Sequence, residues 1–179
     1  MWSRLPACVV AALVFSGPPA ILAQHSAPGG APGVPNLRSM IEKSGYIFSG
    51  TVLRIQPRPA RDASTAATVS VTFRVDRAVR GVRNGEHLTI EEWAGLWQGG
   101  ERYHAGERVF LFLYPPSRLG LTSPIGGWAG RIRVSETSQV ELSAAQSAAW
   151  SGEAAFPGGM ERHAAVHDFA RCIRRMMKE

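Results

Sequence analysis

Apolar and polar residues alternate most regularly between residues 68 and 79, in the segment TVSVTFRVDRAV. Side chains of a β-strand point alternately to the two sides of a sheet, so this alternation predicts a strand with one buried face. The expected buried face carries Val69, Val71, Phe73 and Val75, and the expected polar face carries Ser70, Thr72, Arg74 and Asp76.

Three further strands are predicted around this one. In YIFSGTVLRI, residues 46–55, apolar residues occupy both parities, which is typical of a strand covered on both faces, and Gly50 marks a bend or bulge. EHLTIEEW, residues 86–93, follows Asn84-Gly85, a pair that favours a tight hairpin turn. ERVFLFLYPP, residues 107–116, ends at two prolines, which lack the N–H group that a strand ladder needs. LGLTSP and GRIRV, residues 119–124 and 130–134, are shorter candidates.

Helices are expected on either side of the strands. Asn36 is suited to cap a short helix in LRSMIEKSG, where Leu37, Met40 and Ile41 share one face before Gly45 ends it. The segment from Met160 to Lys178 places apolar residues on one stripe of a helix: Val166, Phe169, Ala170, Ile173 and Met177.

The pattern as a whole predicts a mainly β (α+β) domain. We expect a five-stranded barrel with its short N-terminal helix in residues 36–134, a connecting segment in residues 135–159 and an amphipathic C-terminal helix in residues 160–179. The connecting segment carries only weak helical and loop signals.

The beginning of the chain predicts export. Arg4 precedes an apolar run, and Ile21-Leu22-Ala23 provides the small residues of a cleavage site, so residues 1–23 read as a signal peptide. Residues 24–35, rich in proline and glycine, read as a linker. Cleavage after Ala23 leaves Cys172 as the one cysteine, which excludes an internal disulfide, and no later segment is long enough to span a bilayer. The formal charge of +6 permits contact with anionic surfaces.

The order of three segments resembles the netrin and tissue-inhibitor-of-metalloproteinases type of module. These are YIFSGTVLRI, VSVTFRVDRAVRG and GERVFLFLYPPSRLGLTSPIGG, within residues 44–134. The chain is similar also to uncharacterised exported bacterial proteins that share the GTV, VTFRV and GERVLLFL segments. The resemblance implies a five-stranded Greek-key barrel of the oligonucleotide/oligosaccharide-binding (OB) type and an extracellular protein-binding function. The inhibitors chelate a protease zinc through an N-terminal Cys-x-Cys, which this chain lacks, so that mechanism does not carry over.

Motifs of catalysis and of cofactor binding are not found in the sequence. It has no G-x-S-x-G and no phosphate-binding G-x-x-x-x-G-K-[ST], so we expect no catalytic residue and no cofactor. Glu91 and Glu92 are neighbours on a strand, and we expect two partly solvated side chains on opposite faces. His163 and His167 are four residues apart in the predicted helix, but only Asp168 is near as a third ligand, so we expect no metal site.

Nucleic acid is not an expected partner, and no small-molecule ligand is indicated. The polar face of residues 68–79 offers Ser70, Arg74 and Asp76 but no aromatic residue on which a base can stack. Export also removes nucleic acid from the usual partners.

The stretch EEWAGLWQGGERYHAG, residues 91–106, has two interpretations. Trp93, Trp97, Arg102 and Tyr103 are residue types that are enriched in binding hot spots. A glycine-rich connection between strands can instead fold its aromatic residues back as a lid over an open barrel end. We expect Trp93 to fold back in this way and Trp97, which glycines flank, to be the better candidate for recognition.

Three functions remain open on the sequence alone. The leading hypothesis is an exported, non-enzymatic module that binds another envelope or secreted protein, including a peptidase. The second is an envelope-associated domain that uses its basic C-terminal helix on membrane or polysaccharide. The third is a hydrolase with an unrecognised site, in which His87 or His104 meets a serine and a carboxylate.

Overall fold

The computed structural model describes residues 33–60, 66–99, 102–151 and 162–179, all within one compact unit, Pro32–Glu179. The predicted signal peptide and nearly all of the predicted linker lie outside the described residues. So do the last part of the connecting segment and the first two residues of the predicted C-terminal helix.

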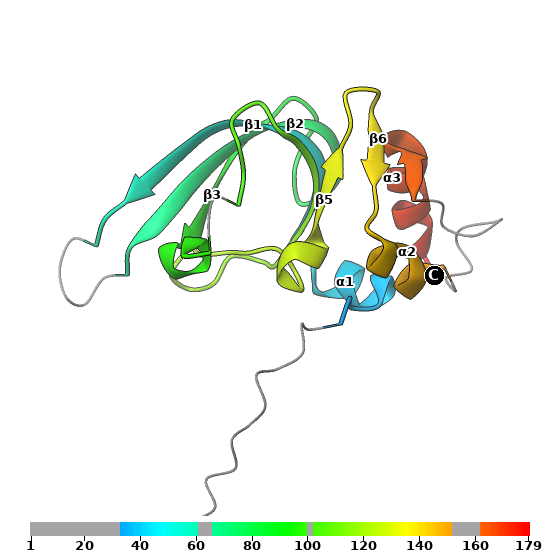
Figure 1. Ribbon diagram of the computed structural model, residues 1–179, viewed down its shortest axis with the longest axis horizontal. Coiled ribbons are helices and arrows are strands. Elements are labelled where there is room, and N and C mark those ends of the chain that lie inside the picture. Colours follow the sequence, from blue (N-terminus) through cyan, green and yellow to red (C-terminus); the bar gives the residue numbers. More distant parts are fainter. Residues whose placement is uncertain (1–32, 61–65, 100–101, 152–161) are drawn as a thin grey trace, which may run out of the picture. The chain divides into compact units, whose positions relative to one another are not determined.

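Within the described residues, seven strands form one antiparallel sheet in the order β3-β2-β1-β4-β5-β6-β7 (Figure 1). They are β1 (Tyr46–Arg58), β2 (Thr68–Arg80), β3 (His87–Trp93), β4 (Arg108–Leu113), β5 (Arg131–Val134), β6 (Gln139–Glu141) and β7 (His163–Ala165). The mainly β class that the sequence predicted is confirmed.

The sheet differs from the predicted five-stranded barrel in strand number and in being open. β6 and β7 extend it beyond β5, so that β3 and β7 are its two edges. The predicted strand LGLTSP forms only two isolated bridges, from Leu121 to Glu91 in β3 and from Pro124 to Leu113 in β4. Gly120, whose φ is 75°, and Pro124, which has no N–H group, limit this segment to single contacts.

The two longest strands form as their patterns predict. β1 and β2 pair over their lengths, with a register shift between Ser49 and Gly50 where a bulge was expected. At Gly50 a Cβ atom would lie 2.7 Å from the carbonyl oxygen of Arg74, so only glycine lets the two strands approach this closely. The turn that follows uses Gly85 at φ 78°, and the side chain of Asn84 accepts a hydrogen bond from the backbone of Ala78 at 2.6 Å.

Three α-helices lie in the described residues: α1 (Leu37–Lys43), α2 (Ala144–Trp150) and α3 (Val166–Met176). Asn36 caps α1 by accepting from the backbone N–H of Ser39 at 3.2 Å, as the sequence indicated. β6 and α2 lie in the segment that was expected only to connect, and α2 begins with a capping box made by Ser143 and Gln146.

The predicted start of the C-terminal helix was wrong. Residues 163–165 do not belong to the helix but pair with β6 as β7, so α3 begins at Val166. Alanine has a high helix propensity, but here the free edge of β6 offers backbone hydrogen bonds that override it. The predicted stripe of α3 is confirmed: Val166, Phe169, Ala170 and Ile173 are buried, and Met177 packs against the same core.

Apolar side chains form two clusters, one on each face of the sheet. The cluster that we call the helix-side core packs the sheet against α1, α2 and α3 and includes Phe110, Phe112 and Phe169. The cluster that we call the loop-side core lies on the other face of β1–β4 and includes Phe48, Phe73 and Leu111. β4 contributes to both because its successive residues point to opposite faces. Apolar packing therefore stabilises the sheet on both of its faces.

No helix among the described residues has the length and apolar character needed to cross a membrane.

The junction between α1 and β1 allows the packing to be tested at one glycine. A Cβ atom at Gly45 would lie 2.5 Å from Cα of Pro115, so Gly45→Ala forces the backbone after β4 to move. We expect a loss of roughly 2 kcal/mol in the free energy of unfolding, measured by urea denaturation. Gly99→Ala is the control, because nothing lies within 4 Å of its added Cβ, and equal losses in the two variants would contradict this packing.

Candidate functional site

The connection from β3 to β4 gathers its aromatic residues around one buried carboxylate, that of Glu92. This residue lies near the end of β3 and is 0% exposed. The strand then turns into a short 3-10 helix, η1 (Ala94–Trp97), which brings the chain back over the loop-side core. Residues 100 and 101 lie outside the described residues.

Three side chains of this connection contact the Glu92 carboxylate. The indole Nε1–H of Trp97 donates to Oε2 at 3.0 Å, and the phenol of Tyr103 donates to Oε1 at 3.3 Å. The guanidinium Nε of Arg102 lies 3.4 Å from Oε2 and supplies the compensating charge. Both oxygens of the buried carboxylate therefore have partners, which its removal from water requires.

Arg131 of β5 ties this cluster to the next part of the sheet. Its guanidinium carbon lies 5.2 Å from the centre of the Tyr103 ring, and it forms an ion pair with Glu107, which precedes β4. Tyr103 also makes edge-to-face contact with Phe73, with ring centres 5.5 Å apart. Trp97, Arg102 and Tyr103 are thus held by charge, hydrogen bonds and aromatic packing together.

Burial sets the protonation behaviour of the cluster. Removal from water raises the pKa of Glu92 above its ordinary value, and Arg102 and the hydrogen bonds from Trp97 and Tyr103 partly oppose that rise. Burial, followed by the nearby negative charge of Glu92, raises the pKa of Tyr103 well above its ordinary value. Tyr103 is therefore a neutral hydrogen-bond donor throughout the physiological pH range.

The two tryptophans have the opposite exposures from those predicted. Trp97 is half-buried against the loop-side core, whereas Trp93 is 52% exposed. Glu92 points inward, and strand alternation sends its neighbour Trp93 to the outer face. The ring of Trp93 lies over Gly95, where a Cβ atom would collide with it. Trp97, Arg102 and Tyr103 thus meet at Glu92, and Trp93 does not join them.

An open groove of about 340 Å³ lies on the outer face beside Trp93. It is lined by Arg58, Pro59, Ala66, Thr68, Glu91, Leu119 and Leu121. Thr68 is the cross-strand partner of Trp93, and Glu91 is two residues before it, so all three side chains share one face. We call the groove together with Trp93 the β3 surface. Glu91 is held by Arg58 at 3.3 Å and by the hydroxyl of Thr68 at 3.0 Å.

Both glutamates and most of the histidines considered in the sequence lie on β3, β7 and α3. Glu91 and Glu92 lie on opposite faces as expected, but Glu92 is fully buried and not partly solvated. His163 lies on β7 and His167 on α3, so they do not share a helical face, and the described residues contain no group of three or more metal-ligating side chains. His87 begins β3 opposite Arg74 and is exposed. The hydrolase hypothesis stays a prediction.

The central role of Glu92 was not predicted, although the sequence contains a signal for it. Glu92 has the same parity as Leu88 and Ile90, whose side chains pack in the loop-side core. The period of two therefore placed a carboxylate on an apolar face, which requires partners from elsewhere in the chain.

Comparisons with protein-family models, with curated proteins and with solved structures find no match to this chain. The resemblance to the netrin and metalloproteinase-inhibitor type of module therefore stays a prediction.

The first prediction for this cluster concerns the loss of the carboxylate. Glu92→Ala removes the acceptor for Trp97 and Tyr103 and leaves the charge of Arg102 without its partner, so unfolding should become easier by about 3 kcal/mol. Glu92→Gln keeps an acceptor oxygen and the shape, and we expect about 1 kcal/mol. Urea denaturation measures both, and equal stability of the alanine variant and the natural protein would contradict the role of Glu92.

The second prediction concerns pH. Because the pKa of Glu92 is higher in the folded state than its ordinary value of 4.5, the folded protein binds this proton more tightly than the unfolded chain does. The resulting stabilisation is fully present below about pH 4.5 and is lost as the pH rises through the folded pKa. The natural protein should therefore lose stability relative to Glu92→Gln as the pH rises. If the natural protein instead gained stability relative to Glu92→Gln as the pH rose, the pKa of Glu92 would be lowered in the folded state, which would contradict this prediction.

Proposed function

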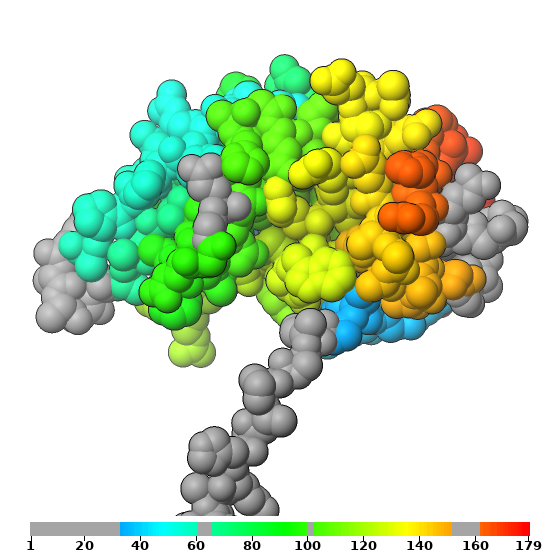
Figure 2. Space-filling model, viewed as in Figure 1, coloured from blue at the N-terminus to red at the C-terminus, as the bar shows by residue number. Residues whose placement is uncertain are grey.

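We propose that this chain is an exported, non-enzymatic module that binds another envelope or secreted protein through the β3 surface. The observation that carries the proposal is the 52% exposure of Trp93 directly over a backbone that the buried Glu92 cluster fixes. Figure 2 shows the end of β3 and η1, in green, on the surface of the molecule.

A fixed tryptophan is well suited to recognition. It offers a large amphipathic contact area with only two rotatable bonds, so little conformational entropy is lost when a partner covers it. Gly95 lets the ring lie close to the backbone, and the contacts of Glu92 with Trp97 and Arg102 hold the turn on which Trp93 stands. A site that is ordered before binding loses less free energy on association.

The groove beside Trp93 indicates the chemistry of the partner. Leu119, which is 82% exposed, and Leu121 supply an apolar wall, and the Arg58–Glu91 pair supplies charge of both signs. This combination fits an extended segment that presents an apolar side chain together with backbone or side-chain polar groups. The resemblance implies a protein partner, and we include a peptidase among the candidates for it.

We also propose that β1 to β4 and residues 119–124 correspond to the five strands of an OB-type barrel. The antiparallel pairings of β1 with β2 and β4, and of β2 with β3, support this correspondence. The single bridges of Leu121 to β3 and of Pro124 to β4 lie where the fifth strand of such a barrel would pair. β5, β6 and β7 would then be additions on the helix-covered side.

If α3 acted as a membrane-surface helix, it would have no apolar face left to insert. The apolar stripe of α3 is buried in the helix-side core, which leaves exposed side chains that are mostly charged, including Arg171, Arg174, Arg175 and Lys178. Such a face can bind an anionic membrane or polysaccharide only by charge, and that binding weakens steeply with salt. We therefore favour the β3 surface.

The proposed function is tested by crosslinking capture from native envelope and culture supernatant with the full chain. We expect Trp93→Ala to lose a specific protein partner, because it removes the largest exposed side chain of the β3 surface without touching the Glu92 cluster. Trp128→Ala is the matched control, since Trp128 is 47% exposed and lies on η2 (Gly127–Gly130). Equal recovery of the partner with Trp93→Ala and the natural protein would overturn the proposal.

A further inference from the structure

A second polar site lies on the helix-covered face of the sheet, away from the β3 surface. A cavity of about 170 Å³ opens between β1, β2, β4, the turn from β5 to β6, and the start of α3. Its wall includes Ser49, Asp76, Arg77, Arg108, Ser138 and His167. Nothing in the proposed function uses this cavity.

Ser49 places an unused hydrogen-bonding group at the inner wall. The residue is 0% exposed, and its hydroxyl has no hydrogen-bond partner among the described residues. A buried hydroxyl without a partner costs free energy, and native structures contain few such groups. Ser49 follows Ile47 with the parity of the helix-side core, so its side chain lies on the cavity side of β1.

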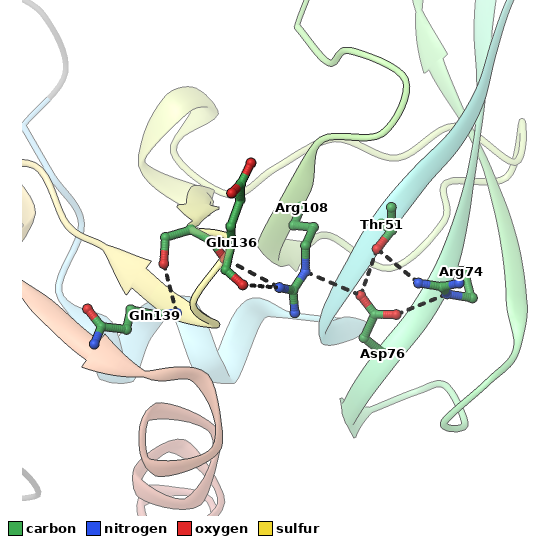
Figure 3. A network of polar contacts seen from close by, with 7 residues as sticks. Thr51, Arg74, Asp76, Arg108, Glu136 and Gln139 are labelled. Carbon is green, nitrogen blue, oxygen red and sulfur yellow. Dashed lines mark hydrogen bonds and ion pairs between the residues drawn. The ribbon is translucent and has the colours of Figure 1, made fainter.

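The one carboxylate in the wall already has its partners. Asp76 accepts from the hydroxyl of Thr51 at 2.8 Å and pairs with Arg74 at 3.1 Å, while Nε of Arg108 lies 4.0 Å away (Figure 3). Arg108 also donates through one terminal nitrogen to the carbonyl oxygens of Ser135 and Glu136, which anchors it to the turn between β5 and β6 (Figure 3). The network fixes Arg108 in place at the cavity.

Arg77 is the cation in the wall that remains available. It is half-buried, and its guanidinium forms no hydrogen bond or ion pair with the side chain of any other described residue. Together, Arg77 and Arg108 bring two positive charges, and Asp76 brings one negative charge. Arg74 also pairs with Asp76, so the wall is net positive and favours an anion.

The start of α3 adds a favourable field for an anion. Its N-cap residue, Ala165, has no side chain that can cap the helix. The backbone N–H of Val166 donates to the carbonyl oxygen of Ser138 at 3.0 Å, which fixes the helix start against the cavity. Unsatisfied N–H groups at a helix start carry partial positive charge. Ser138 itself is held at φ 62°, a conformation that serine rarely adopts.

We propose that this cavity binds a carboxylate group. Arg77 supplies the charge and a planar pair of donors that matches a carboxylate, the hydroxyl of Ser49 supplies a further donor, and the start of α3 supplies the surrounding field. A monovalent carboxylate fits this wall better than a divalent phosphate, because a phosphate would bring a second negative charge close to Asp76. A small carboxylic acid and the carboxyl end of a peptide both present this group.

The test titrates the full chain with sodium propionate at constant ionic strength and follows backbone amide signals by nuclear magnetic resonance. We expect saturable shifts around Ser49, Arg77 and His167. Arg77→Met should weaken binding about tenfold or more, since it removes a charged donor. Arg118→Met is the matched control, because it removes the same charge from an exposed position beyond the other end of β4.

Two further ligands and one further variant define the site. If acetyl-Ala-Ala binds more tightly than propionate and acetyl-Ala-Ala amide does not bind, the bound carboxylate is the carboxyl end of a peptide. If acetyl-Ala-Ala and propionate bind equally tightly, it belongs to a small acid. Ser49→Ala should lower the affinity for propionate without lowering folding stability, because the lost hydroxyl has no partner. Equal affinities of Arg77→Met and Arg118→Met, shifts elsewhere in the chain, or tighter binding of inorganic phosphate would overturn the proposal.

Discussion

The burial of the Glu92 carboxylate is the constraint on which the rest of the loop-side face depends. A charge that is removed from water must be matched by a partner and by hydrogen bonds, or the fold loses several kcal/mol. Trp97, Tyr103 and Arg102 meet this need, and each of them comes from the connection between β3 and β4. The requirement of one side chain thus positions η1, Arg102 and Tyr103, in the described part of the connection.

The path of the connection in turn determines what the outer face displays. Because Glu92 points inward, Trp93 points outward, and the anchored turn holds it beside the groove that Leu119 and Leu121 line. Farther along the same face of the sheet, where α3 covers it, the polar network of Asp76 and Arg108 borders a cavity. This face therefore offers two separate surfaces for ligands.

Local sequence patterns were sufficient to predict β2 and the start of α1. The alternation in residues 68–79 predicted β2 and its buried side chains, and Asn36 predicted the start of α1. The start of α3 was not predictable, because β7 exists only where the distant edge of β6 offers hydrogen bonds to residues 163–165. β6 and α2 were missed in the same way, since short elements carry too few residues to show a period.

The Glu92 cluster depends partly on local pattern, whereas the Ser49 cavity depends on residues that are distant in the sequence. Parity placed Glu92 on an apolar face, but its partners come from a loop without a period, so the exposures of Trp93 and Trp97 were reversed in the sequence-based expectation. The cavity at Ser49 was beyond any local pattern, because its wall combines residues of β1, β2, β4 and α3 with a turn. Only the folded sheet brings these residues together.

The most direct test of the account follows hydrogen exchange at the indole N–H groups of the tryptophans by nuclear magnetic resonance. Trp97 donates to the buried Glu92, and Trp150 donates to the carbonyl oxygen of Pro35, so both protons should exchange slowly. Trp93 and Trp128, which are exposed, should exchange quickly. In Glu92→Gln the protection of Trp97 should fall while that of Trp150 stays unchanged. A Trp97 proton that exchanges as quickly as that of Trp93 in the natural protein would contradict the central role of Glu92.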